Sequence, residues 1–273
     1  MKTCGIKLLV LIGSVVSFAA QAVHAKQDYS VAYKTLVEQR SDAIVSVKFV
    51  MRFSTGGEEQ RNEDRTQGAI VSADGLLLLP DRAVSFDFGS MGGQNSAAGQ
   101  MVANSSDFRV RLPNSDQWQT ADLVTRDSEL GLAWLRIRDL KQKLKYIDLN
   151  ASVEAVPGMT FYTLLRTSDE WGAVPVVRLG RLLGQTNTPR TVFLADGMPG
   201  LAFNERGQIL GYVDADLVAL GRSRGNSGFG LDMSDMMFYM LPAKRIAAAT
   251  LQAAKLPVVR ANEDAEEDSS ANK

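Results

Sequence analysis

The chain has 273 residues, of which 45% are hydrophobic and 22% are charged, as in an ordinary soluble globular protein. The formal net charge of −1 gives no electrostatic reason to expect nucleic acid or an anionic membrane as a partner. Composition therefore favours a folded protein whose ligands are recognised by local chemistry rather than by overall charge.

The N-terminus has the pattern of a secretory signal peptide. Lys2 and Lys7 supply a basic start, residues 8–20 form an apolar run, and Val23 and Ala25 occupy the −3 and −1 positions of a cleavage site. The apolar run, as a helix, rises only about 20 Å, which is short for a membrane span. We expect cleavage after Ala25, a periplasmic or secreted mature protein and no stable membrane insertion, with an uncleaved anchor as the alternative.

Cleavage would remove the whole cysteine and histidine content, because Cys4 and His24 are the only residues of these types. A mature chain without them has no disulfide, no thiolate nucleophile, no Cys/His zinc site and no imidazole base. We therefore expect no cofactor and no metal site.

A short helix and then a series of strands are predicted along the mature chain. Residues 28–42 place apolar side chains near helical spacing behind Asp28 or Ser30, so a helix is expected within 26–42. Alternating apolar residues and turn signals then predict a first β-barrel over 43–138. Its strands are expected at 43–53, at 67–80 with a central Asp-Gly turn, and at 108–113, 118–127 and 130–137.

Three stretches separate or follow these strands. The polar residues 54–66 predict a turn, the Gly-, Ser- and Asn-rich residues 85–106 a long loop, and the charged residues 139–150 a connector. A second β-barrel with a helix is expected over 151–258, and the acidic residues 259–273 are expected as a disordered tail. The strands of this second barrel are expected at 159–167, 173–186, 191–195, 201–218 and 228–242, and its helix is expected at 243–255.

Four segments of these predicted barrels follow one another along the chain in an order that resembles a known pattern. They are "QGAIVSADGLLLLPDRAV", "ADLVTRDSELGLAWLRI", "GMPGLAFNERGQILGYV" and "FYMLPAKRIAAATL". They resemble the segments around the catalytic His, Asp and Ser, and the closing strand and helix, of HtrA-like serine proteases. The resemblance covers about residues 43–255. The expected fold class is therefore all-β, a trypsin-like double β-barrel with a short N-terminal helix and a C-terminal helix.

The resemblance also implies that the catalytic positions are vacant. Alignment places Arg82 where the family has its His, Gly131 where it has its Asp, and Met198 where it has its Ser. Arg stays protonated near neutral pH and cannot act as a general base, and a thioether is no acyl acceptor. We expect a pseudoprotease rather than an enzyme, with these three residues converging in a cleft between the barrels.

The turn that holds Met198 has two interpretations. Its backbone N–H groups, with Arg82, can form a retained ligand-binding cleft, although the carboxylate of Asp196 would oppose an incoming oxyanion. Alternatively, the turn serves only to close the second barrel. A buried Arg82 needs an acceptor, and Asp196 or a backbone carbonyl is the expected one.

Other residues offer competing sites. Ser227, in "GNSG", is the nucleophile of an alternative enzyme with a Lys base such as Lys244. The thioethers within 233–240 suit Cu(I) but also suit core packing, and Asp214 and Asp216 suit calcium but also a solvated strand face.

Two classes of function follow from the sequence. The first is a module that binds an extended peptide or a protein partner in the barrel cleft or by strand addition. The second is a serine endopeptidase of the HtrA-like family with unconventional catalytic residues, built on Ser227. The absence of His from the expected mature chain favours the first.

Overall fold

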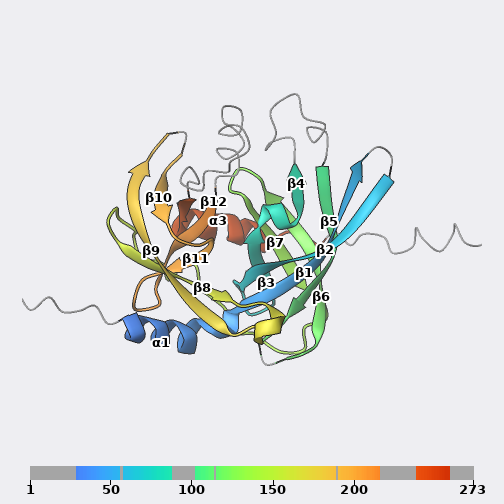
Figure 1. The fold of residues 1–273 in the computed structure, drawn as a ribbon, viewed down its shortest axis with the longest axis horizontal. Helices are drawn as coiled ribbons and strands as arrows, with labels where there is room; N and C mark the ends of the chain where they lie inside the picture. The colour runs from blue at the N-terminus through green and yellow to red at the C-terminus, as the bar shows by residue number, and fades with distance from the viewer. Residues whose placement is uncertain are drawn as a thin grey trace, which may run out of the picture.

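Two closed antiparallel β-barrels of six strands each lie side by side and make up the fold (Figure 1). The computed structural model describes residues 29–55, 58–87, 102–113, 115–188, 190–215 and 238–258. The predicted fold class is confirmed: an all-β, trypsin-like double barrel with one N-terminal and one C-terminal helix.

The first barrel closes where its first strand pairs with its fifth. Its strands are β1 (Ile44–Thr55), β2 (Glu58–Ile70), β3 (Leu76–Pro80), β4 (Ser85–Asp87), β5 (Val102–Arg111), β6 (Trp118–Asp127) and β7 (Leu132–Ile137). They run in the order β1-β2-β3-β7-β6-β5, and β4 adds to the edge of β5. The predicted Asp-Gly turn joins β2 to β3, and Gly75 adopts the positive φ of 82° that such a turn requires.

Two loop predictions are wrong in part. Residues 54–66 were expected as a turn, but β1 and β2 stay paired out to Thr55 and Glu58, and 61–65 are exposed. A ribbon with two solvated faces needs no apolar alternation, so its sequence lacks a strand signal. The stretch 85–106 is strand at both ends, in β4 and β5, and residues 88–101 lie outside the described part of the chain.

The second barrel closes around a core of buried aromatic and aliphatic side chains. Its strands are β8 (Thr160–Arg166), β9 (Pro175–Thr186), β10 (Val192–Asp196), β11 (Gly200–Phe203), β12 (Ile209–Ala215) and β13 (Phe238–Pro242), in the order β10-β13-β12-β11-β8-β9. Phe161 is fully buried, and a Cβ added at Gly180 or Gly197 would lie within 3 Å of its ring. Glycine at these two positions therefore lets β9 and the turn after β10 rest on the Phe161 ring.

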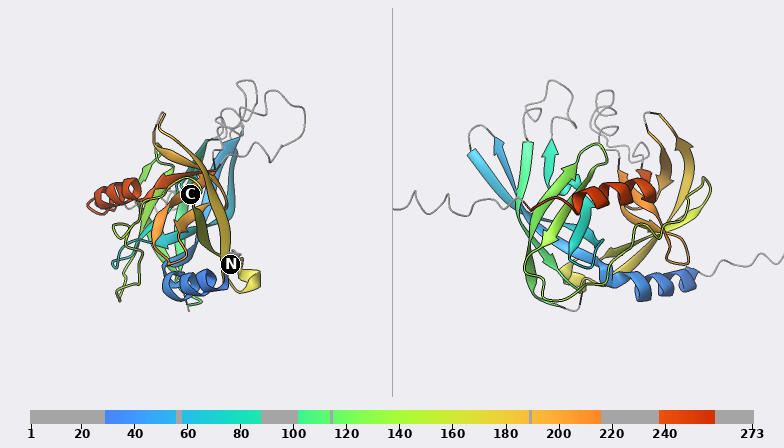
Figure 2. Two further views of the ribbon diagram at one scale, coloured as in Figure 1. Left: turned by 90° about the vertical axis from the view of Figure 1, so that its left-hand side faces the viewer. Right: turned by 180° about the vertical axis from the view of Figure 1, so that it is seen from behind.

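The two helices tie the barrels together from outside. Helix α1 (Tyr29–Arg40) packs on β8 and β9, and the 3₁₀ turn η5 (Asp169–Trp171) lies between those strands. Helix α3 (Ala243–Ala253) follows β13 and reaches the first barrel, where Trp134 Nε1 donates to Thr250 Oγ1 at 3.0 Å (Figure 2). Within the described ranges, no helix is long and apolar enough to cross a membrane.

The guanidinium of Arg166 fastens the second barrel to the start of the first. Its Nε donates to Ile44 O and its Nη2 to Ser41 O, both at 2.6 Å, and its Nη1 donates to Ala173 O at 3.0 Å. In addition, the Gln67 side chain exchanges two hydrogen bonds with the Arg166 backbone. One side chain thus satisfies three backbone carbonyls from segments far apart in the sequence.

We expect Arg166→Met to lower the free energy of unfolding by about 2–4 kcal/mol, because three part-buried carbonyls lose a charged donor. Urea denaturation at pH 7 measures the loss. Arg178→Met, on an exposed position of β9, is the matched control and should change stability by less than about 0.5 kcal/mol. A loss for Arg166→Met no larger than that of the control would contradict the assignment.

Candidate functional site

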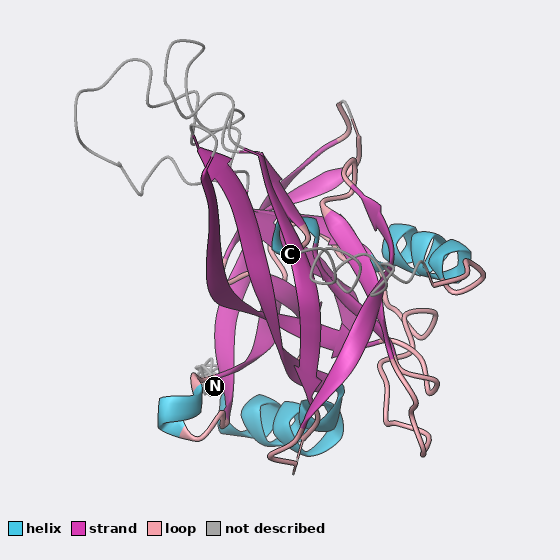
Figure 3. Ribbon diagram, turned by 90° about the vertical axis from the view of Figure 1, so that its right-hand side faces the viewer, coloured by secondary structure: helices cyan, strands magenta, loops and turns pink. Residues whose placement is uncertain are grey.

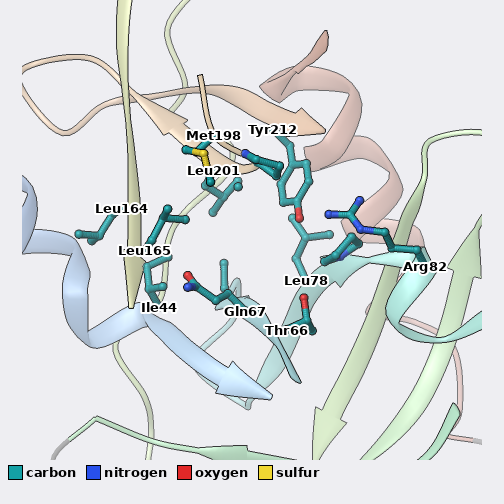
Figure 4. Close-up of a pocket in the computed structure, with 15 residues that line it drawn as sticks. Ile44, Thr66, Gln67, Leu78, Arg82, Leu164, Leu165, Met198, Leu201 and Tyr212 are labelled. Atoms are coloured by element: carbon teal, nitrogen blue, oxygen red, sulfur yellow. The ribbon is translucent and has the colours of Figure 1, made fainter. Parts of the chain in front are cut away.

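A cavity of about 280 Å³ lies where the two barrels meet (Figure 4). The first barrel contributes Ile44, Gln67 and Leu78, and the second contributes Leu165 and Leu201. Most of the side chains around the cavity are aliphatic, and among the described residues none that lines it carries a carboxylate. The cavity is therefore suited to an apolar group of a ligand.

Met198 borders this cavity from the turn between β10 and β11. Its side chain remains 44% exposed, although it is a large apolar group. Gly197 packs this turn closely against the Phe161 ring. The turn ends at Gly200, whose φ of 134° is a backbone conformation that favours glycine. The position that the sequence matched to a nucleophile thus presents a thioether at the mouth of the cavity.

Arg82 borders the same cavity from the first barrel and pairs with Asp214 of the second. It lies in the 3₁₀ turn η2 (Asp81–Ala83) after β3, and its Nη1 donates to Asp214 Oδ1. Asp214 lies on β12 and is only 5% exposed. Burial is the largest single influence on Arg82 and would lower the pKa of its guanidinium, but the charge and hydrogen bond of Asp214, together with Tyr212 and Tyr239, raise that pKa above its ordinary value. Burial likewise raises the pKa of Asp214, against the opposing effect of Arg82.

Gly131 lies on the far side of this ion pair. It precedes β7 with a φ of 70°, and its carbonyl accepts a hydrogen bond from Asp81 N at 2.9 Å. A Cβ added at Gly131 would stand 3.5 Å from Asp214 Oδ2 and 3.4 Å from Tyr239 Oη. Asp214 therefore fills the space beside Gly131, so the carboxylate next to Arg82 comes from β12 and not from position 131.

The expected acceptor for Arg82 is corrected by this geometry. Asp196 was expected to pair with Arg82, but it is exposed at the end of β10, opposite Arg181, and does not line the cavity. Asp214 was assigned to a solvated face or a calcium site, and instead it is buried against Arg82. The signal was present in the sequence: Asp214 ends the apolar run "ILGYV", and an acid at a buried position needs a cation.

Buried titratable groups surround the ion pair. The Tyr212 ring stands between Met198 and Arg82 in Figure 4, and burial raises the pKa of its hydroxyl, with the Asp214 charge adding to the shift. Burial also raises the pKa of Asp81 to about 6, although Arg126 opposes the shift. A tyrosine with a raised pKa is a poor nucleophile, so the polar groups of this region are suited to holding a structure or a ligand.

The remaining predicted sites are only partly within the described chain. Ser227, Asp216 and the methionines at 233, 236 and 237 lie outside it. Met240 is fully buried in the second barrel, and Lys244 is exposed at the start of α3. Across the residues that the structure describes, no three His, Cys, Asp or Glu side chains gather as a metal site would require.

The fold is similar to that of solved structures, although the chain matches no family of known sequence. No family model and no curated protein matches the chain. Among solved structures, it is similar to the crystal structure of the apo MamO protease domain from Magnetospirillum magneticum. The two are 15% identical with a TM-score of 0.49, over 77% of this chain and 97% of that one.

We expect Asp81 to make stability depend on pH. Its pKa of about 6 in the folded protein exceeds its ordinary value of 3.8, so between these pH values the folded state holds a proton that the unfolded state has lost. The stability that this group contributes is present at low pH and is lost as the pH rises toward 6 and beyond.

Asp81→Asn should therefore gain stability relative to the wild type as the pH rises from 4.5 to 7, as measured by urea unfolding at several pH values. Asp116→Asn, at an exposed position, is the control and should run parallel to the wild type. An Asp81→Asn profile that also runs parallel would refute the assignment.

Proposed function

We propose that the chain is a periplasmic or secreted pseudoprotease related to the HtrA-like proteases, which binds an extended peptide or a protein partner. The observation that carries the proposal is the apolar cavity between the barrels, bordered by Met198 and by the Arg82–Asp214 pair. Motif alignment with the protease family assigns two catalytic positions to Arg82 and Met198, which border the cavity, and the groups around it are suited to binding rather than acyl transfer.

Loss of catalysis is supported by the chemistry of the three aligned positions. Peptide hydrolysis by this fold needs a nucleophile, a general base and an orienting acid that act as a unit. Arg82 remains protonated and is committed to Asp214, and Met198 has no proton to lose. Removing single members of such a triad costs on the order of 10⁴–10⁶ in rate, so a site that lacks both nucleophile and base is inactive in practice.

Peptide binding is supported by the size and lining of the cavity. Its volume of about 280 Å³ accommodates one large apolar side chain, and burying such a side chain contributes roughly 1.5–3 kcal/mol. Leu165 and Leu201 supply apolar contact area, while Arg82 and Tyr212 supply polar groups at one side. We infer a partner segment in extended conformation that inserts a Leu-, Met- or Phe-sized side chain between the barrels.

The first expected result is the absence of proteolysis. Purified protein should neither cleave unfolded casein nor react with a fluorophosphonate probe, because the site lacks a nucleophile and a base. Gel electrophoresis and probe fluorescence measure the two activities. Labelling that disappears in a Ser227→Ala variant would overturn the proposal and establish the alternative endopeptidase with Ser227 and a Lys base.

The second expected result is selection of apolar peptides by the cavity. Phage-displayed random heptapeptides should enrich sequences with one large apolar residue, and a fluorescein-labelled selected peptide should bind with an affinity that anisotropy measures. Leu165→Glu places a charge in the cavity and should weaken binding at least about tenfold. Leu179→Glu, at a half-exposed position of β9 outside the cavity, is the control. Equal losses in both variants would count against the cavity as the binding site.

A further inference from the structure

A row of cations crosses the outer face of the first barrel, away from the cavity. In the strand register, Lys48 of β1 lies directly opposite Arg65 of β2 on one side and Arg109 of β5 on the other. None of the three lines the cavity between the barrels. Like charges at directly opposite positions of a sheet repel one another, so this row destabilises the bare barrel.

The indole ring of Trp118 places a fourth cation, Arg111, beside this row. Trp118 of β6 lies opposite Arg111 of β5. Lys48 Nζ stands 4.4 Å from the centre of the Trp118 ring, Arg111 Cζ 5.3 Å and Arg65 Cζ 6.0 Å. Three cations thus contact one aromatic ring, which helps to hold their side chains in place. We call Lys48, Arg65, Arg109, Arg111 and Trp118 the basic face.

Asp169 neutralises only part of this charge. It lies in η5, the short yellow helix near the start of β1 in Figure 1, and accepts hydrogen bonds from Arg65 and Arg111. Within the described ranges, no carboxylate lies within 4.0 Å of Lys48 or Arg109. The basic face therefore keeps an excess of positive charge at the positions nearest its centre, as an anion-binding surface does.

The chain itself carries a segment of complementary charge. Residues 263–268, "EDAEED", hold five carboxylates in six positions. The chain after helix α3 runs along the first barrel: Arg136 of β7 donates to Ala254 O at 3.3 Å, and Val258 packs against the barrel core (Figures 2 and 3). From Val258, ten extended residues reach up to about 35 Å, and a tether of this length gives an effective concentration in the millimolar range.

We propose that residues 263–268 dock on the basic face of the same chain. Their carboxylates supply the negative charge that Lys48 and Arg109 lack, and docking relieves the repulsion along the row. The acidic segment then shields the basic face from other anions. This contact is independent of the cavity, so it stands whether or not the cavity binds peptide.

Carbodiimide coupling of the full-length chain tests the contact, because the reagent joins an amine to a carboxylate only where the two touch. We expect amide links from Lys48 to residues 263–268 in the monomer band, identified by mass spectrometry of the digested protein. Raising NaCl from 0.05 to 0.5 M should lower the yield at least about fivefold, because the Debye length falls to a few ångströms.

Two variants at exposed positions separate docking from chance encounter. Arg109→Gln removes a cation of the basic face and should lower the Lys48 yield about threefold or more, whereas Arg178→Gln on β9 should leave it unchanged. Exposed Lys143 in the connector serves as the reference amine. A yield of links at Lys48 no higher than at Lys143 would refute the proposal. Links found only in covalent dimers would also refute it, because the segment would then bind a second copy of the chain.

Discussion

The partly buried ion pair between Arg82 and Asp214 is the contact on which the region between the barrels depends. Arg82 comes from a 3₁₀ turn of the first barrel and Asp214 from a central strand of the second. The buried carboxylate of Asp214 without its partner would cost several kcal/mol, so the second barrel needs Arg82 of the first to satisfy this group. The pair therefore fixes how the two barrels meet, and with it the shape of the cavity that they enclose.

This pair also underlies our proposal that the site binds a ligand rather than catalysing hydrolysis. In a hydrolytic triad, the central group must be able to take up and release a proton at the working pH. Arg82 keeps its proton, and the adjacent carboxylate raises its pKa further. A permanent ion pair then stands beside an aliphatic cavity, with Met198 at the mouth. The result is an apolar recess with one polar wall.

Charge is distributed very differently on the two faces that we assign to binding. The cavity is mostly aliphatic, and Arg82, the cation that borders it among the described residues, is already paired with Asp214, so it recognises a ligand by shape and apolar area. The basic face is exposed and only partly neutralised by Asp169, so it recognises charge and responds to salt. The two surfaces share strands β1 and β2 but no residue, and each uses a different physical interaction.

The sequence by itself predicted most of the strands and the two terminal helices, because apolar periodicity and turn residues are local signals. The interpretation of Arg82, Gly131 and Met198 as vacant catalytic positions rests on the resemblance of short motifs and stays a prediction. Tertiary structure decided the rest. Asp214 became the partner of Arg82, and residues 58–66 became a strand, because both outcomes depend on which distant segment lies alongside. The basic face arises only where three strands pair in register. Strand pairing brings together residues that no local pattern connects, and that is why these features required the folded chain.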